Sequence, residues 1–299
     1  MKNRKIFGDI LAKPIQEITC QSALHQLKRK IPYGWDLNLY RGCAHNCIYC
    51  YARYTHDYLG NADFDQVYVK TNILEHLEAE LSSPTWKREV VNIGGVTDSY
   101  QPAEAKYKLM PEVLKLLIKY KTPAIISTKS NLIMRDYDLI AELAELTYIN
   151  IAATITTMDE ADRIKLEPHA SPSQERFEVL QQFRKTNASV GLHTMPIIPH
   201  ITDSYDNIER LCEEAQKAKV HYMLPGVLYL RGTTRQVFFD FVQKSYPDLY
   251  APLRTLYKTG GADKEYKDRL YSQIVNPLRQ MYGISNSYMR PMKEKMGKY

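Results

Sequence analysis

Residues 41–51 read Arg41-Gly42-Cys43-Ala44-His45-Asn46-Cys47-Ile48-Tyr49-Cys50-Tyr51, and they hold three of the five cysteines of the chain. Thiolates this close repel one another unless a metal neutralises them, and so short a loop cannot bridge all three as disulfides. An iron–sulfur cube takes four ligands, so a site with three cysteines leaves one corner open to a substrate or cofactor. The residues alone leave two alternatives, a zinc site completed by His45 or His56 and a group of purely structural cysteines.

The composition is that of an ordinary globular protein. The 299 residues are 44% hydrophobic and 25% charged, and a chain of this length can fold as one catalytic domain with appendages. No run approaches the roughly 18 consecutive apolar residues of a membrane span, and no apolar signal segment follows the basic first residues. Cys20 and Cys212 offer no disulfide framework, and reduced, clustered cysteines suit the cytosol. We therefore expect a cytoplasmic protein with no membrane partner.

The formal charge of +6 is concentrated at the two ends of the chain. Residues 231–299 hold thirteen Lys and Arg against six Asp and Glu, together with eight tyrosines. A basic surface with exposed aromatic rings would bind nucleic acid through phosphates and stacked bases. The alternative is a set of amphipathic helices in which apolar positions such as Tyr250, Leu253 and Tyr257 are buried beneath solvated lysines. The helical spacing of these residues favours the second interpretation.

Short β-rich runs alternate with longer helical patterns between residues 36 and 230, as expected for βα units of a parallel sheet. This pattern predicts an α/β fold, a partial (βα)6 TIM-type barrel over residues 36–232. An N-terminal arm over residues 1–35 precedes it, and a helical C-terminal extension over residues 233–299 follows it. The expected strands are Asp36–Tyr40, Glu89–Ile93, Ala124–Ser127, Tyr148–Ala153, Ser189–Met195 and His221–Tyr229. The expected helices are Ile73–Leu81, Lys108–Tyr120, Tyr137–Leu146, Ser173–Thr186 and Asp206–Lys217.

Polar or unusual residues follow strand after strand. In βα barrels the loops at the carboxyl ends of the strands converge on one face, where the chemistry takes place. We therefore expect these residues to meet at one mouth. They are the cysteines after the first strand, Gly94 to Glu104 after the second, Thr128-Lys129-Ser130 after the third, Thr154 and Thr156 after the fourth, Pro196, Pro199 and His200 after the fifth, and Arg231-Gly232 after the sixth.

The C-x3-C-x2-C triplet, with Tyr49 just before its last cysteine, resembles the signature of the radical S-adenosylmethionine (SAM) enzymes. The resemblance implies that Cys43, Cys47 and Cys50 bind a [4Fe–4S] cluster whose open iron is chelated by SAM. It also implies that an electron from a donor such as flavodoxin or ferredoxin cleaves SAM to methionine and a 5′-deoxyadenosyl radical. That radical would abstract hydrogen from the substrate.

A narrower resemblance rests on Thr97-Asp98-Ser99-Tyr100-Gln101-Pro102-Ala103-Glu104 together with Thr128-Lys129-Ser130. These residues resemble the group that includes spore photoproduct lyase, often labelled DNA repair photolyases. In the lyase itself a Thr or Ser after the second strand, a Lys after the third and a Ser on the fourth contact SAM, and the resemblance implies Thr97, Lys129 and Thr154 here. Tyr49 and Gly95 are expected as further SAM neighbours. The resemblance covers roughly residues 36–230 and implies lyase-type chemistry.

One position departs from this pattern. Spore photoproduct lyase has a hydrogen-donating cysteine directly before its Thr or Ser, where this chain has Val96, so the sequence does not support thymine-dimer repair. Tyr100 and Glu104 are candidate catalytic residues, since a tyrosine can relay a proton or hydrogen atom and a buried glutamate can act as a base. Helix capping by Glu104 and a core position for His193 are the structural alternatives. Glu167-Pro168-His169 resembles a family motif whose role is open.

The leading hypothesis is a radical SAM enzyme that acts on an unidentified substrate, with nucleic acid as one possible class. The alternative is a nucleic-acid-binding protein in which an iron–sulfur or zinc site is structural and the basic ends bind the partner. Cys20 and Cys212 cannot supply a second cluster. Phosphate-binding and dinucleotide-binding glycine motifs are absent from the sequence, so nucleotide hydrolysis and hydride transfer are poor alternatives.

Overall fold

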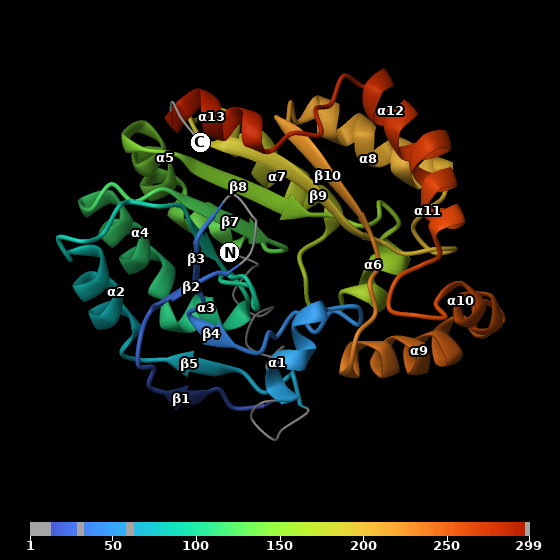
Figure 1. Ribbon diagram of the computed structural model, residues 1–299, viewed down its shortest axis with the longest axis horizontal. Helices are drawn as coiled ribbons and strands as arrows, with labels where there is room; N and C mark the ends of the chain where they lie inside the picture. The colour runs from blue at the N-terminus through green and yellow to red at the C-terminus, as the bar shows by residue number, and fades with distance from the viewer. Residues whose placement is uncertain (1–12, 29–32, 58–62, 297–299) are drawn as a thin grey trace, which may run out of the picture.

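A curved seven-stranded sheet forms the centre of the computed structural model, which describes residues 13–28, 33–57 and 63–296 (Figure 1). The strand order is β10-β9-β8-β7-β6-β3-β2; β2 runs antiparallel to β3, and all other neighbours are parallel. The six parallel strands form an open, partial barrel, which confirms the predicted fold class. The strands are β2 (Leu24–Gln26), β3 (Trp35–Leu37), β6 (Val91–Ile93), β7 (Ala124–Thr128), β8 (Ile149–Thr154), β9 (Ser189–Ile197) and β10 (Tyr222–Val227).

Helices connect the parallel strands and cover the outer face of the sheet (Figure 1). Every residue of β8 is buried, as is typical of a parallel strand packed on both faces. The five predicted helices are confirmed to within a few residues, whereas the short helices α3 and α6 were not predicted. The helices are α2 (Ile73–Leu81), α3 (Pro102–Tyr107), α4 (Leu109–Lys119), η2 (Asn131–Asp136), α5 (Tyr137–Leu146), α6 (Glu160–Leu166), α7 (Ser173–Phe183) and α8 (Tyr205–Lys217).

The predicted strand Asp36–Tyr40 is wrong in its second half. β3 ends at Leu37, and residues 40–41 form β4 (Tyr40–Arg41) in a separate sheet with β5 (Tyr68–Lys70) and β1 (Gln16–Ile18). At the bend, the Asn38 side-chain oxygen accepts a hydrogen bond from the Val96 N–H at 3.0 Å. This bend delivers the cysteine-rich loop to the carboxyl end of the barrel, where η1 (Tyr51–Arg53) and α1 (Tyr54–Asp57) follow it.

The segments on either side of the barrel differ in character. In the predicted N-terminal arm, β1 pairs with β5 and β2 extends the central sheet, while residues 1–12 lie outside the described part. The C-terminal segment is helical, and the division of the chain into three domains stays a prediction. The helices of the C-terminal segment are α9 (Thr233–Ser245), η3 (Pro247–Leu249), α10 (Tyr250–Leu256), α11 (Lys264–Leu270), η4 (Tyr271–Val275), α12 (Asn276–Met281) and α13 (Met289–Met296).

The C-terminal helices bury much of their aromatic surface. Tyr257 is fully buried and donates its hydroxyl to the Leu228 carbonyl, and Tyr266 is buried with its hydroxyl on Asp203. Leu253 and Tyr257, two of the predicted apolar positions, are buried as the amphipathic interpretation expects, whereas Tyr250 is partly exposed. None of the helices in the described part of the chain is long and apolar enough to span a membrane.

Candidate active site

The three clustered cysteines line one cavity of about 620 Å³ at the carboxyl ends of the parallel strands. The turn that carries them needs glycine at its start, because Gly42 has a φ of +74° and an added Cβ would lie 2.4 Å from the Gln66 carbonyl oxygen. The Gly42 carbonyl accepts hydrogen bonds from the Thr97 hydroxyl at 2.6 Å and from the Gln101 amide at 3.2 Å. The loop after β6 therefore holds the cysteine loop in place.

The environment of the thiols suits a metal cluster. Cys43 and Cys47 are buried and Cys50 is partly exposed. Burial raises the pKa of Cys43 well above its usual range, and the neighbouring Asp98 and cysteines raise it further. Burial also raises the pKa of Cys47, to about 12, even though Lys129 lowers it. Thiolates would form here only with a strong source of positive charge, which iron supplies.

Across the described residues, no three His, Cys, Asp or Glu side chains are placed to hold a single metal ion. An iron–sulfur cube does not require such convergence, since each of its cysteines binds a different iron. His56, one of the two proposed zinc ligands, faces the Gln66 carbonyl with its Nε2 at 3.2 Å and packs against Phe64. The donor set therefore fits the cube that the three-cysteine motif predicted.

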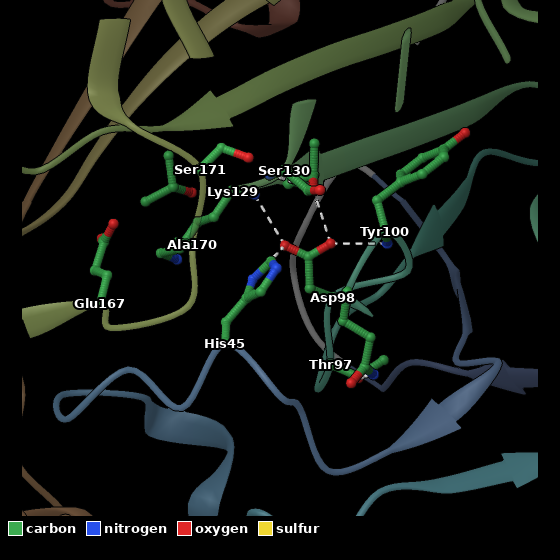
Figure 2. Close-up of polar contacts among 12 residues, drawn as sticks. His45, Thr97, Asp98, Tyr100, Lys129, Ser130, Glu167, Ala170 and Ser171 are labelled. Atoms are coloured by element: carbon green, nitrogen blue, oxygen red, sulfur yellow. Dashed lines mark hydrogen bonds and ion pairs between the residues drawn. The ribbon is translucent and has the colours of Figure 1, made fainter. Parts of the chain in front are cut away.

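Asp98 is the centre of a buried network that joins three loops (Figure 2). Its carboxylate accepts hydrogen bonds from the Tyr100 N–H at 2.9 Å, the Thr128 hydroxyl at 2.8 Å and the Lys129 N–H at 2.9 Å. It also pairs with His45, whose Nδ1 lies 3.3 Å away on the cysteine loop. Burial alone would raise the pKa of Asp98, but His45 and the two backbone donors hold it at about 2. Sequence reasoning did not single out Asp98; its place in a loop after a buried strand was the available signal.

The five predicted SAM neighbours all line the cavity with the cysteines. These are Tyr49, Gly95, Thr97, Lys129 and Thr154. The Lys129 ammonium lies 5.7 Å from the centre of the Tyr49 ring. Burial disfavours the charge of Lys129, yet Cys47 and Glu167 outweigh that effect, so the pKa of the lysine is raised. It stays a cation beside the three cysteines.

Gly94 and Gly95 are needed for different reasons. Gly94 has a φ of +86°, so it forms a turn that L side chains rarely adopt. Gly95 lies against Asp36 instead, and an added Cβ would lie 2.7 Å from the Asp36 carboxylate. The carbonyl of Gly95 accepts the hydroxyl of Tyr51. Gly95 thus lets β3 and the loop after β6 approach closely beside the cavity.

Glu167 is a buried residue whose contacts give the Glu-Pro-His segment a structural role. Its carboxylate accepts the hydroxyl of Tyr49 and forms an ion pair with Arg176 at 2.5 Å. Arg176 also donates to the Thr154 carbonyl at 2.7 Å and to the Ser171 carbonyl at 2.7 Å. Burial opposes the charge on Glu167, but Arg176 and Lys129 lower its pKa overall. This pair connects the cysteine loop to the end of β8.

The structure does not place Tyr100 and Glu104 in the cavity. Both side chains are fully buried, and neither is among the residues that line it. Glu104 accepts the N–H groups of Leu109 and Met110 at the start of α4, and it pairs with Arg135 at 2.6 Å. Burial and the neighbouring Asp136 raise the pKa of Tyr100 well above its usual range. The geometry therefore does not support the catalytic assignments, because neither side chain lines the cavity.

His193, by contrast, lines the cavity. Its Nδ1 lies 3.4 Å from the Ser127 hydroxyl, and its Nε2 lies 3.3 Å from the hydroxyl of the buried Tyr222. Burial and the nearby Lys129 lower the pKa of His193 to about 4, so its imidazole is neutral at neutral pH. Val96 also lines the cavity, and its side chain presents no hydrogen-bond donor.

Comparison with known proteins assigns the family. The model of the radical SAM superfamily matches residues 37–227, and the chain belongs to that superfamily. It is a radical SAM enzyme, of a family that uses a [4Fe–4S] cluster and SAM and generally needs a reductant such as flavodoxin or ferredoxin.

Two relatives match along most of their length. An uncharacterized protein of Mycobacterium tuberculosis is 34% identical over 279 residues, which cover 91% of this chain and 82% of the relative. An uncharacterized protein of Methanocaldococcus jannaschii is 26% identical over 253 residues, which cover 84% and 88%.

Among solved structures, the fold is similar to that of spore photoproduct lyase. A mutant of that enzyme with bound S-adenosylmethionine and dinucleoside spore photoproduct superposes with a TM-score of 0.67 at 12% identity. The match covers 90% of this chain and 79% of the lyase. At this identity the likeness shows the fold alone, an open radical SAM barrel.

Proposed function

We propose that Cys43, Cys47 and Cys50 hold the [4Fe–4S] cluster, and that the walls of the same cavity bind SAM and one C–H bond of the substrate. When bound, the cluster and SAM together supply reductive cleavage of SAM and a 5′-deoxyadenosyl radical for hydrogen abstraction. The observation that carries this proposal is the convergence of the three cysteines with Lys129, Gly95 and Thr154 on one cavity.

The residues of the cavity wall would have different roles, which depend on their positions. Lys129 is the cation of the cavity wall, and we assign it to the carboxylate of SAM, whose charge it would offset in a poorly solvated pocket. Tyr49 offers its ring below that cation while its hydroxyl is held by Glu167. The Thr97 hydroxyl donates a hydrogen bond to the Gly42 carbonyl. Thr97 thus fixes the cysteine loop beside the ligand and also lines the cavity.

The remaining wall favours an uncharged substrate group. The cavity also reaches Asn92, Ser127 and His193, which are polar but neutral, and the side chains of Met195 and Tyr229 at its mouth. The only acidic side chain among the lining residues, Asp98, is satisfied by His45 and three hydrogen-bond donors. Hydrogen abstraction needs one C–H bond held beside the radical, and such a wall can orient a neutral group by hydrogen bonds.

Anaerobic reconstitution with iron and sulfide tests the proposal. Low-temperature electron paramagnetic resonance of the reduced protein should show a [4Fe–4S]+ signal that shifts when SAM is added. Chromatography should detect 5′-deoxyadenosine and methionine. Cys47→Ala should lose the signal and the products, whereas Cys20→Ala, a cysteine away from the cavity, should keep both. Tightly bound zinc, or a cluster signal indifferent to SAM, would contradict the assignment.

A further inference from the structure

Four cations lie on α9, on α10 or close to these helices in sequence; we call Arg231, Arg235, Arg254 and Lys258 the basic rim. The backbone brings their segments together, since the Leu230 N–H donates to the Gly260 carbonyl at 2.6 Å. Arg235 and Arg254 lie against the same ring, with their guanidinium carbons 5.1 Å and 5.0 Å from the centre of Phe239. Arg235 is fixed further by hydrogen bonds to the Thr259 carbonyl at 2.8 Å and the Tyr257 carbonyl at 2.6 Å. Arg231, Arg254 and Lys258 are exposed.

The basic rim carries positive charge that the described residues do not neutralise. None of its four members forms an ion pair with an Asp or Glu in residues 13–28, 33–57 or 63–296. The two guanidinium groups that share the Phe239 ring carry like charges and repel each other. Such a surface gains most from an anionic partner that contacts several of its charges together.

The basic rim adjoins the cysteine loop. The Thr234 hydroxyl, next to Arg235 in sequence, donates to the Cys50 carbonyl at 2.8 Å. α9 packs on η1, which begins directly after Cys50. Cys50 is also partly exposed, whereas Cys43 and Cys47 are buried. α9 and α10 lie side by side at the edge of the molecule, outside the curved sheet (Figure 1).

We propose that the basic rim is the docking surface for an acidic one-electron carrier protein, which delivers its electron to the cluster on the Cys50 side. The inference rests on the proposed function. In the step, the reduced carrier is oxidised by one electron and the enzyme is reduced by one, with no atom transferred. The bond between Thr234 and Cys50 places the basic rim beside a proposed cluster ligand, and an electron donor must come close to such a ligand.

Binding of flavodoxin to the cluster-loaded enzyme tests the surface directly. Oxidised flavodoxin serves as the acidic probe, and its dissociation constant is measured by titration calorimetry at low and high salt. Arg254→Glu and Arg231→Glu should each weaken binding about tenfold, and salt should weaken the wild-type complex, since electrostatic attraction between exposed charges is screened. Lys185→Glu, an exposed lysine in the turn between α7 and β9, is the matched control and should leave binding unchanged.

SAM cleavage then separates docking from chemistry. With dithionite as a small reductant, both rim variants should cleave SAM within about twofold of the wild-type rate, because dithionite needs no docking surface. With flavodoxin hydroquinone the same variants should be about tenfold slower at limiting carrier concentration. If the wild-type enzyme failed to cleave SAM with dithionite, the proposed function itself would be wrong, which is a different outcome from failed docking.

Two other results would overturn the docking proposal. The first is unchanged flavodoxin affinity in both rim variants. If the same variants also bound single-stranded oligothymidylate more weakly, the basic rim would be assigned to nucleic acid instead. Equal loss of activity with dithionite and flavodoxin would show a structural role for these arginines and would also contradict it.

Discussion

Glu167 and Arg176 form an ion pair at 2.5 Å in which both side chains are almost completely buried. The pair stands between two functional segments, since Glu167 accepts the Tyr49 hydroxyl and Arg176 donates to the Thr154 carbonyl. A charge left alone at such depth is costly, because neither water nor a counter-ion replaces the lost partner. The pair therefore ties the cysteine loop to the end of β8.

The first prediction follows from this pair. Glu167→Gln should lower the free energy of unfolding by about 3 kcal/mol, because Arg176 would stay buried without its counter-charge. Glu160→Gln is the matched control, since Glu160 is nearly half exposed in its ion pair with Arg163 and should cost less than about 1 kcal/mol. Urea unfolding of the cluster-loaded proteins under anaerobic conditions measures both. Equal losses in the two variants would contradict the role given to the buried pair.

The second prediction concerns Glu104, which the sequence suggested as a catalytic group. Glu104→Gln should destabilise the protein by about 2 kcal/mol or more, since the carboxylate binds two backbone N–H groups of α4 and the Arg135 guanidinium. The rate of SAM cleavage per assembled cluster should stay within about twofold of wild type. Iron quantification combined with product analysis gives the rate of SAM cleavage per assembled cluster. A large loss of rate with unchanged stability would return Glu104 to the catalytic residues.

These two carboxylates show how far the sequence alone could go. The order of strands and helices, the cysteine triplet and the residues at the strand ends follow from local patterns, and the structure gathers Lys129, Gly95 and Thr154 around the cysteines as expected. A pattern of buried and polar positions tells which residues meet at the mouth of a barrel. It does not tell which of them turn away from it.

The position of Glu104 outside the cavity and the omission of Asp98 from the expected site residues have the same physical origin. Asp98 lies in the loop after β6 and Glu104 in the short helix α3 that follows it, and only the three-dimensional path of this segment decides that Glu104 faces the start of α4 while Asp98 faces His45. Contacts with residues that are distant in sequence decide the orientation of each carboxylate. Asp98 binds groups on two other loops, at His45 and Thr128, and no local pattern encodes such contacts.

The third prediction tests the close approach at Gly95. Gly95→Ala would bring a Cβ to 2.7 Å from the Asp36 carboxylate, so either β3 or the loop after β6 must shift. We expect the cluster to assemble normally while SAM no longer shifts its spectrum at ordinary SAM concentrations. Gly34→Ala is the control, because within the described part of the chain an added Cβ there meets only Glu89, at 4.0 Å. Unaltered SAM binding in Gly95→Ala would show that this strand end is not part of the SAM site.

The fourth prediction concerns the response of His193 to pH. Its pKa is lowered to about 4 by burial and by Lys129, whereas an unfolded chain would hold a histidine near the ordinary value of about 6.5. Between these two values the unfolded state binds the proton and the folded state does not, so stability falls as the pH drops from about 6.5 towards 4.

At pH 5 this single group should cost the wild-type protein about 1 to 2 kcal/mol relative to pH 7. His193→Gln removes the titrating group, so its unfolding free energy should fall less between pH 7 and pH 5 by about that amount. Other histidines with lowered pKa, such as His221, contribute equally to both proteins and cancel in the difference. If the unfolding free energy fell equally between pH 7 and pH 5 in wild type and His193→Gln, the imidazole in the cavity would accept a proton as readily as one in water.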